Sequence, residues 1–384
     1  MENKFIYFTS AMDNNSFKEY LSKWTVSPNL SNQNFHNKLI RSLSLSHDMD
    51  VISVRSINRH FSETKLDAKI VREGNIFWKY PLVKRNRIDK FFKLFKRIKN
   101  ISMQDSKLVF VDVLNLSLLK NAIKYAKKYN KKVIGVCTDS PLNISFLRER
   151  YKQNLLKLGQ SLDGYIFLTD KIGELYNINH KPCVCIDGVS EFNNVKLPRR
   201  IEGDYIYFGG SLMKEYGVLN LIEAFKKLER NDLKLVICGH HLEKDRLFDA
   251  IGDSQNIIYV GPLNYEENIE LETHSILAVN PRPKNENIDL YSLPSKTLEF
   301  LSNGCLTVTV DNPLLKKHYE PCIIWAKSGE PDDLLEAMQK ALSLNRTERE
   351  MYSLLGKNKV MQYTSLETIN KQIDEELLSK LLLD

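Results

Sequence analysis

The sequence has none of the features that mark membrane-spanning or secreted proteins. No apolar run approaches the length of about 18 residues that a membrane helix needs. Residues 1–12 have neither a long apolar core nor a cleavage site for secretion. The six cysteines are scattered and form no CxxC pair, which argues against a disulfide framework or a zinc site. We therefore expect a cytoplasmic protein with reduced, buried thiols.

At 384 residues the chain is longer than one typical domain, and its length predicts two. Short runs rich in Val, Ile, Phe and Tyr alternate with longer helical patterns, which is typical of βαβ units and parallel sheets. In the first half the candidate strands are residues 5–9, 51–54, 108–114, 132–137, 165–168 and 183–186. In the second half they are residues 205–208, 234–238, 257–260, 276–279 and 306–310. Each half therefore has enough strands for a sheet of its own.

A linker separates the two sets of strands. Residues 193–203 contain Pro198 and little apolar periodicity, so we place the domain boundary there. The predicted fold class is α/β, with two doubly wound, Rossmann-like domains at residues 1–192 and 204–365. The helical stretch 366–384 is expected to pack back on the first domain. Because ligands of such sheets bind beyond the carboxyl ends of the strands, we expect a site in a central cleft between the domains.

A glycine turn follows the first strand of the second half. Gly209, Gly210 and Ser211 stand between an apolar strand and a helical pattern over residues 218–228. At such a turn, backbone amides and the positive end of a helix can approach a phosphate. The turn is neither GxGxxG nor GxxxxGK[ST], which argues against a dehydrogenase or an NTPase. A turn that needs glycine only for its backbone geometry is an open alternative.

A second polar segment follows the strand at residues 276–279. It combines two cations, two hydroxyls and a carboxylate at loop and helix-start positions: Arg282, Ser295, Lys296, Thr297 and Glu299. The cations suit phosphate oxygens, the hydroxyls can donate from a helix N-terminus, and the glutamate can accept from ribose hydroxyls. The alternative is purely structural, with Ser295 as an N-cap, Lys296 as a solvated charge and Glu299 compensating the helix dipole.

These stretches resemble a known family. The runs YFGGS at residues 207–211, EYGV at 215–218 and LIEAF at 221–225 look like the donor domain of family 4 glycosyltransferases, which have the GT-B fold. The run PSKTLEFLSNG at residues 294–304 is similar to the sugar-nucleotide helix of members from bacterial capsule and exopolysaccharide clusters. The resemblance is good over roughly residues 205–311. In the first half, only residues 39–52 resemble the helix, turn and second strand that open this fold.

The resemblance implies a glycosyltransferase that takes a sugar from a nucleotide diphosphate sugar, which we expect to be a UDP-sugar. It implies that Glu299 corresponds to the glutamate that binds the donor ribose. It also places Gly209, Gly210 and Ser211 against the diphosphate. No cofactor and no metal ion are required, because positive side chains and helix ends can stabilise the leaving diphosphate.

The chain departs from the family pattern in its charged residues. Many relatives carry a second glutamate eight positions before the first, where this chain has Tyr291. Relatives also often have an arginine and a lysine near the glycine turn, where this chain has Ser211 and Tyr216. Lys214, together with the two cations of the second polar segment, is our candidate for the missing positive charge.

The first half is expected to bind the acceptor. Asp139 follows the strand at residues 132–137, near a place where relatives often have a histidine or aspartate. There it can orient or deprotonate an acceptor hydroxyl. A turn or N-cap role before Pro141 is the open alternative. Residues 27–33 precede a helix and are expected to shape the acceptor pocket. Asp48 and Asp50 form a DxD pattern, which we interpret as a polar turn and not as a metal site.

The net charge of +7 is unevenly distributed, with nine basic residues and one acid between Lys79 and Lys99. Apolar residues recur there at helical spacing, and basic residues cover the other face. Such a helix can lie on an anionic membrane. The candidate membrane residues are Lys90, Phe91, Phe92, Lys93, Phe95, Lys96 and Arg97. The alternative is an ordinary domain helix with its apolar stripe in the core.

Together these features predict a retaining glycosyltransferase of bacterial surface polysaccharide synthesis. Its acceptor is expected to be a glycan on a polyprenyl diphosphate, at the inner face of the cell membrane, where the protein would be peripheral. Two alternatives share the architecture: a sugar-nucleotide epimerase and a noncatalytic partner subunit. Nucleic-acid binding is not expected, because no DNA or RNA motif accompanies the basic residues. Formation of a homo-oligomer is left open.

Overall fold

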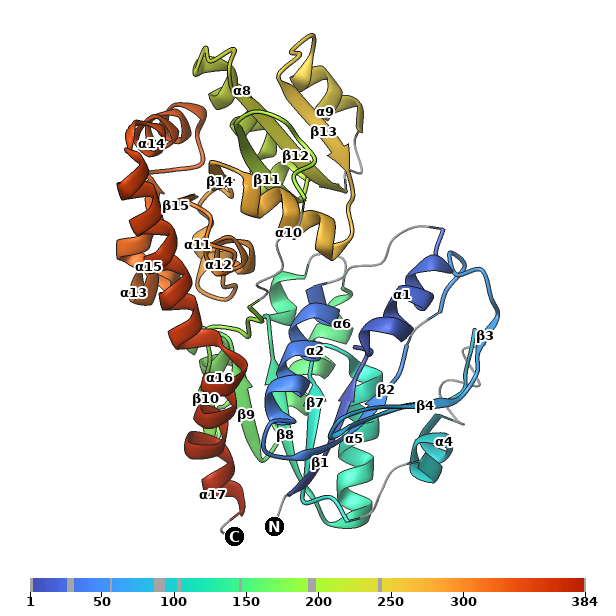
Figure 1. Cartoon of the computed structure of the whole chain (residues 1–384). Helices are drawn as coiled ribbons and strands as arrows, with labels where there is room; N and C mark the ends of the chain where they lie inside the picture. Colours follow the sequence, from blue (N-terminus) through green and yellow to red (C-terminus); the bar gives the residue numbers. More distant parts are fainter. Residues whose placement is uncertain are drawn as a thin grey trace. The chain divides into compact units, whose positions relative to one another are not determined.

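The computed structural model describes residues 3–25, 31–55, 57–85, 94–101, 105–144, 147–192, 198–240 and 244–382. The chain forms two compact units (Figure 1). Unit 1 contains Met1–Val189 and Leu366–Asp384, and unit 2 contains Ser190–Ser365. Residues 193–197 of the expected linker lie outside the described part of the chain. Unit 2 begins at Ser190, whose N–H donates to the Thr364 carbonyl at 2.7 Å.

Unit 1 is built on an eight-stranded sheet in the order β10-β9-β8-β7-β1-β2-β5-β4. Its strands are β1 (Lys4–Thr9), β2 (Asp48–Ser53), β4 (Lys69–Glu73), β5 (Ile76–Tyr80), β7 (Leu108–Asp112), β8 (Lys132–Cys137), β9 (Gly164–Phe167) and β10 (Cys183–Cys185). All neighbours pair in parallel except β4 with β5. A short pair, β3 (Lys65–Leu66) and β6 (Val83–Lys84), stands beside it.

Helices cover both faces of this sheet (Figure 1). They are α1 (Asn14–Ser22), α2 (Ser31–Leu43), α4 (Leu94–Ile101), α5 (Leu116–Tyr129), α6 (Glu149–Gly159), α7 (Asp170–Tyr176), α16 (Leu366–Ile373) and α17 (Ser379–Leu382). On one face Phe5 and Tyr7 pack with Leu39 of α2. On the other face Phe8 contacts Tyr125 of α5, with ring centroids 5.9 Å apart. Burial of apolar residues on both faces is what a parallel sheet requires.

The C-terminal residues pack on unit 1. Ile369, Ile373 and Leu377 are fully buried in its core. His47 Nε2 lies 2.7 Å from Asp374 Oδ1, and the Ser42 hydroxyl donates to the Leu366 carbonyl at 2.7 Å. Apolar and polar contacts together therefore fix this helical stretch along unit 1.

Asp48 and Asp50 do not form the expected polar turn. Both lie within β2, where the Asp50 side chain is fully buried. Lys79 Nζ on the neighbouring β5 donates to Asp50 Oδ2 at 2.8 Å, and Lys4 Nζ lies at 3.9 Å. The turn prediction is wrong because two lysines from adjacent strands neutralise a carboxylate that would otherwise be costly to bury.

Unit 2 has a six-stranded parallel sheet in the order β13-β12-β11-β14-β15-β16. Its strands are β11 (Tyr205–Ser211), β12 (Lys234–His240), β13 (Ile257–Gly261), β14 (Leu277–Asn280), β15 (Thr307–Val310) and β16 (Ile324–Ala326). Its helices are α8 (Val218–Lys227), α9 (Lys244–Ile251), α10 (Tyr265–His274), α11 (Glu286–Asp289), α12 (Ser295–Ser302), α13 (Pro313–Tyr319), α14 (Pro331–Ser343) and α15 (Arg346–Thr364).

The helices of unit 2 lie on both faces of its sheet (Figure 1). Val218 of α8 and Leu334 of α14 pack against Ile206 on one face. Leu271 of α10 and Phe300 of α12 pack on the other. The α/β prediction with two doubly wound, Rossmann-like domains is confirmed, and every predicted strand range overlaps a strand of the structure.

Candidate functional site

The strand order of unit 2 identifies where a ligand would bind. Counted along the chain, its six strands lie in the order 3-2-1-4-5-6. In such sheets the connections leave in opposite directions from the first and fourth strands, which here are β11 and β14, and ligands bind beyond the carboxyl ends of that pair. The glycine turn ends β11, and Arg282 follows β14 by two residues. Topology therefore brings both polar segments of the sequence to one edge of one sheet.

Glycine is required at this edge because backbone and side chains approach closely. A Cβ on Gly209 would lie 2.2 Å from the Tyr207 hydroxyl, and a Cβ on Gly239 would lie 1.8 Å from the Gly210 carbonyl oxygen. Gly217, with φ 77°, begins α8 and would place a Cβ 2.2 Å from the Pro281 carbonyl oxygen. The geometric need for glycine is therefore real at these three positions.

Arg282 lies on the loop that leaves β14. Its side chain is largely shielded, with 19% exposure, and its Nη2 lies 3.8 Å from Asp289 Oδ1 of α11. Asp289 is occupied as well, because its Oδ2 accepts from the Asn285 N–H at 2.7 Å. Arg282 is thus held near an acid, at a distance longer than a hydrogen bond. Lys214, the other candidate cation of the turn, is exposed in a 3-10 turn at Lys214–Tyr216.

The start of α12 separates its two hydroxyl residues. Ser295 is the first residue of the helix and is exposed, and the cap position belongs to Pro294, so Ser295 is not an N-cap. Thr297 is fully buried and accepts from Asn280 Nδ2 at 2.9 Å. The Thr297 hydroxyl therefore ties α12 to β14, whereas the Ser295 hydroxyl faces solvent.

Lys296 lies between two carboxylates. Its Nζ is 2.9 Å from Glu299 Oε2, one helical turn later, and 4.0 Å from Glu272 Oε1 on α10. Glu272 is fully buried, and its Oε2 accepts from Asn303 Nδ2 at 2.7 Å. Burial opposes the charge on Lys296, but Glu299 and Glu272 together raise its pKa above the ordinary value. Lys296 therefore stays protonated at this edge of the sheet.

The sequence prediction did not include Glu272. Its partner Lys296 is 24 positions away in the printed sequence, and only the packing of α10 beside α12 brings them together. The residues around position 272 are mostly polar, so the sequence gives no signal that this glutamate is buried. A fully buried glutamate is rare unless it is paired.

Unit 1 shows a comparable edge. In its sheet, too, the connections leave in opposite directions from two neighbouring strands, which here are β1 and β7. There Asn32 Nδ2 of α2 donates to Asp112 Oδ2 at 2.7 Å, and His36 Nε2 lies 3.7 Å from the same oxygen. Burial lowers the pKa of His36 despite this carboxylate, so the imidazole is neutral at physiological pH. The sequence interpretation missed Asp112 because it lies inside a predicted strand.

Asp139 lies one strand further along the same edge, after β8. Its Oδ1 accepts from the Ser140 N–H at 2.7 Å, and Ser140 caps the 3-10 turn at Pro141–Asn143. The N-cap of this turn is therefore Ser140 and not Asp139. Asp139 is half-buried, and its role as a base stays a prediction.

The described part of the basic segment packs on unit 1. Ile98 of α4 is fully buried, Lys124 Nζ lies 4.2 Å from the centroid of the Phe95 ring, and Arg97 Nη1 donates to the Leu82 carbonyl at 2.9 Å. Lys96 is exposed. The other candidate membrane residues, Lys90, Phe91, Phe92 and Lys93, lie outside the described residues. None of the helices in the described part of the chain combines the length and apolarity that a membrane crossing needs.

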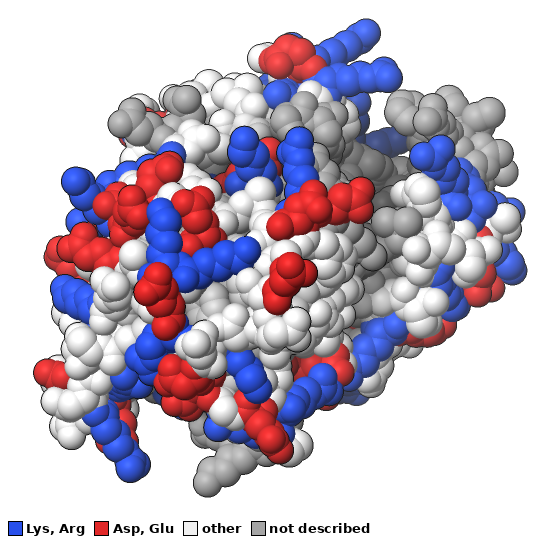
Figure 2. Space-filling view, turned by 90° about the horizontal axis from the view of Figure 1, so that it is seen from above, with Lys and Arg blue, Asp and Glu red and all other residues white. Residues whose placement is uncertain are grey.

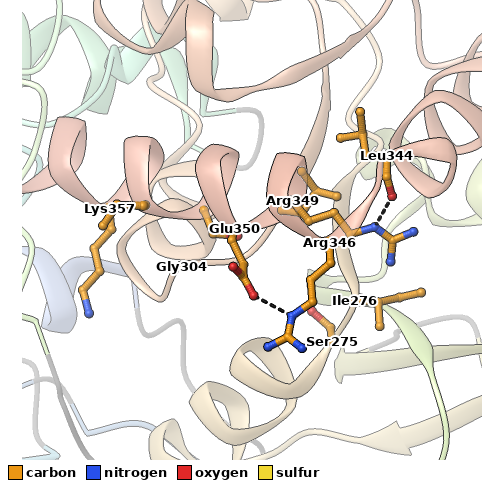
Figure 3. Close-up of a pocket in the computed structure, with 11 residues that line it drawn as sticks. Ser275, Ile276, Gly304, Leu344, Arg346, Arg349, Glu350 and Lys357 are labelled. Carbon is orange, nitrogen blue, oxygen red and sulfur yellow. Dashed lines mark hydrogen bonds and ion pairs between the residues drawn. The ribbon is translucent and has the colours of Figure 1, made fainter.

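A groove of about 610 Å³ lies elsewhere on unit 2 (Figure 3). Ile276 and Leu306 on its wall directly precede β14 and β15, so it lies at the amino ends of these strands. Its arginines are engaged, because Arg346 Nε donates to Glu350 at 2.8 Å and Arg349 Nε donates to the Leu344 carbonyl at 2.9 Å. The groove is therefore on the wrong edge of the sheet for the site described above.

One comparison with known proteins concerns unit 2. Residues 189–359 match the protein family described as Glycosyl transferases group 1. No curated protein is matched by the sequence. Residues 189–359 are therefore similar to group 1 glycosyltransferases, in agreement with the enzyme class that the sequence predicts.

Solved structures resemble the chain over its whole length. Sucrose-phosphate synthase from Thermosynechococcus elongatus has a TM-score of 0.71 at 10% identity, over 100% of this chain and 99% of that chain. The E. coli trehalose-6-phosphate structure bound with UDP-2-fluoro glucose has a TM-score of 0.70 at 10% identity, over 99% of both chains. Anabaena HepE in complex with UDP and glucose has a TM-score of 0.68 at 12% identity, over 99% of this chain and 100% of that chain. The chain as a whole has the GT-B fold.

Proposed function

We propose that this protein transfers a sugar from a nucleotide diphosphate sugar, bound by unit 2, to a glycan acceptor bound by unit 1. The observation that carries this proposal is the meeting of the glycine turn, Arg282 and the α12 start at the β11–β14 edge of a domain similar to group 1 glycosyltransferases. UDP is the expected carrier, because two similar structures hold UDP or a UDP-sugar. Glu299 is the residue proposed to bind the ribose.

The proposed acceptor is a glycan on a polyprenyl diphosphate, in bacterial surface polysaccharide synthesis. The resemblance of residues 294–304 to capsule and exopolysaccharide members supports this, as does the basic segment before α4. The proposed reaction retains the anomeric configuration. Asp139 is the candidate residue for activating the acceptor hydroxyl. In a retaining transfer the leaving diphosphate can itself help the incoming hydroxyl, so a strong protein base is not demanded.

Binding and turnover of nucleotide sugars test the donor assignment. A ligand at about 100 times its Kd stabilises the folded state by about 2.7 kcal/mol, so the preferred donor should raise the melting temperature measurably. Sugar transfer to extracted lipid-linked glycans should then release the nucleoside diphosphate. Product formation from the sugar nucleotide alone would instead identify an epimerase, and donor binding without turnover would identify a noncatalytic subunit.

Liposome sedimentation tests the membrane assignment. The protein should sediment with anionic vesicles and not with neutral ones, because each basic residue near an anionic surface contributes about 1 kcal/mol. Lys96→Glu should weaken this binding, whereas Lys340→Glu, an equal charge change at an exposed position of α14, should not. Equal sedimentation with both vesicle types, or none with either, would contradict the proposal.

On the face of the molecule in Figure 2, basic and acidic side chains of the described residues are interspersed.

A further inference from the structure

Glu272 is an unusual residue for its position. Its carboxylate has no exposure to solvent, and it stands in the last turn of α10, the negative end of the helix dipole. A buried carboxylate is costly unless it is paired and hydrogen-bonded, and an apolar side chain of similar size would fill the space without that cost. The contacts from Asn303 Nδ2 at 2.7 Å and Lys296 Nζ at 4.0 Å compensate part of this cost.

These contacts make Lys296 a bridge between two acids. Glu272 belongs to α10, whereas Lys296 and Glu299 belong to α12. The Lys296 side chain has 32% exposure and the Glu299 side chain 26%, so both reach the surface, while Glu272 lies behind them. An ammonium group this close to two carboxylates has much of its charge already compensated. It is therefore a weaker partner for a diphosphate than the sequence suggests.

We propose that Glu272 and Lys296 are positioning residues, in which the buried Glu272 anchors Lys296 and Lys296 holds the Glu299 carboxylate in place for the donor ribose. This proposal rests on the proposed function, because it assumes that Glu299 accepts from ribose hydroxyls. It reassigns Lys296, which acts on the ribose through Glu299 and not on the diphosphate directly. Glu272 is a new member of the site, one that touches no substrate atom.

The proposal predicts that the two residues affect recognition of ribose hydroxyls and nothing else in the nucleotide. Titration calorimetry would measure the Kd of UDP, with GDP and ADP in parallel, and then of the 2′,3′-dideoxy form of the nucleotide that binds. A hydrogen bond to a charged group corresponds to a roughly 10- to 100-fold change in Kd, so the wild type should prefer the ribonucleotide by that factor.

Lys296→Met keeps the unbranched shape and most of the length of the side chain and removes its charge. It should weaken ribonucleotide binding by roughly tenfold, since Glu299 is no longer held, and change the dideoxy Kd by less than about twofold. Glu272→Gln should give the same pattern, as should Glu299→Gln. The matched control is Lys227→Met on α8, which removes another ion-paired lysine of unit 2, 2.8 Å from Asp332, and should change neither Kd.

Each outcome decides between the two roles of Lys296. Equal weakening of the ribonucleotide and its dideoxy form in Lys296→Met would place Lys296 on the diphosphate and overturn the proposal. Glu272→Gln with wild-type binding of both forms would remove Glu272 from the site. Were Glu272→Gln unfolded, the partly exposed Lys296 would still give the test through its own variant. A wild type that binds no nucleoside diphosphate would instead refute the proposed function together with this inference.

Discussion

One methyl group at Gly239 should seriously damage the sheet of unit 2. Gly239 pairs with Gly210 across β11 and β12 and has a φ of 142°. A Cβ added there would lie 1.8 Å from the Gly210 carbonyl oxygen, whereas carbon and oxygen in close contact stay about 3.3 Å apart or more. Both groups belong to backbone, so neither can rotate away. Gly239→Ala must therefore separate the two strands at the edge that carries the candidate site.

The loss in the free energy of unfolding has two sources, backbone strain and broken hydrogen bonds between the strands. A residue with a side chain forced into this region of φ and ψ costs about 1–3 kcal/mol. Loss of one or two ladder hydrogen bonds beside the clash costs about 0.5–1.5 kcal/mol each. We therefore expect a loss of about 3–4 kcal/mol in the free energy of unfolding. For a unit of this size each kcal/mol lowers the melting temperature by about 2–4 °C.

Gly261 provides the matched control. It also has positive φ, at 77°, but a Cβ there would meet no atom within 4 Å. Gly261→Ala should cost only the backbone strain, about 1–2 kcal/mol. Thermal unfolding followed by circular dichroism, with nucleotide binding measured in parallel, compares the two variants. Equal losses of melting temperature would show that backbone strain, and not the approach of Gly210, explains the glycine at position 239.

Three further substitutions test other parts of the chain. Burial raises the pKa of Asp13, but hydrogen bonds from Ser16 and Tyr80 outweigh it and lower the pKa below the ordinary 3.8. The stability that Asp13 contributes is therefore present above its unfolded-state pKa and is lost as the pH falls through the lower folded-state pKa. Urea midpoints of the wild type and Asp13→Asn should therefore differ at pH 7, and the difference should shrink as the pH falls below about 3.9, the ordinary value for an unfolded chain. A difference that does not change with pH would contradict this. Arg282→Ala should weaken nucleoside diphosphate binding by roughly tenfold, since charge-assisted bonds to phosphate are lost, and unchanged calorimetric Kd values would exclude Arg282 from the site. Asp139→Asn should lower kcat by roughly 10²- to 10⁴-fold at unchanged donor Kd if the carboxylate acts as a base, and a kcat close to that of the wild type would exclude this role.

The strands that the sequence predicts are those with continuous apolar runs, such as β7 and β8, because burial on both faces leaves a clear signal. The hairpin of β4 and β5 was missed because β4 lies at the sheet edge and carries Lys69, Arg72 and Glu73. Exposed edge strands accept charged residues, so their sequences resemble loops.

The candidate site was predictable where its residues are consecutive in sequence and not where packing assembles them. The glycine turn and the run at residues 294–299 are local motifs. The Lys296–Glu272 contact joins two helices, and Thr297 turns into the interior although Ser295 and Lys296 before it reach the surface. In a helix, residues one position apart point in directions that differ by about 100°. Consecutive residues of a helical motif therefore include both buried and exposed positions.

The charge distribution at the β11–β14 edge ranks the cations of the site. Lys296 Nζ has one carboxylate oxygen at 2.9 Å and a second at 4.0 Å, whereas Arg282 faces a single one at 3.8 Å, beyond hydrogen-bond distance. Arg282 therefore loses less electrostatic attraction to its present partner when it turns toward a bound anion. Its planar guanidinium group also suits phosphate oxygens. For a nucleotide without ribose hydroxyls, where the Glu299 contact is absent, the loss of Arg282 should matter more than the loss of Lys296. That order separates a cation that binds the diphosphate from a cation that organises the residue beside it.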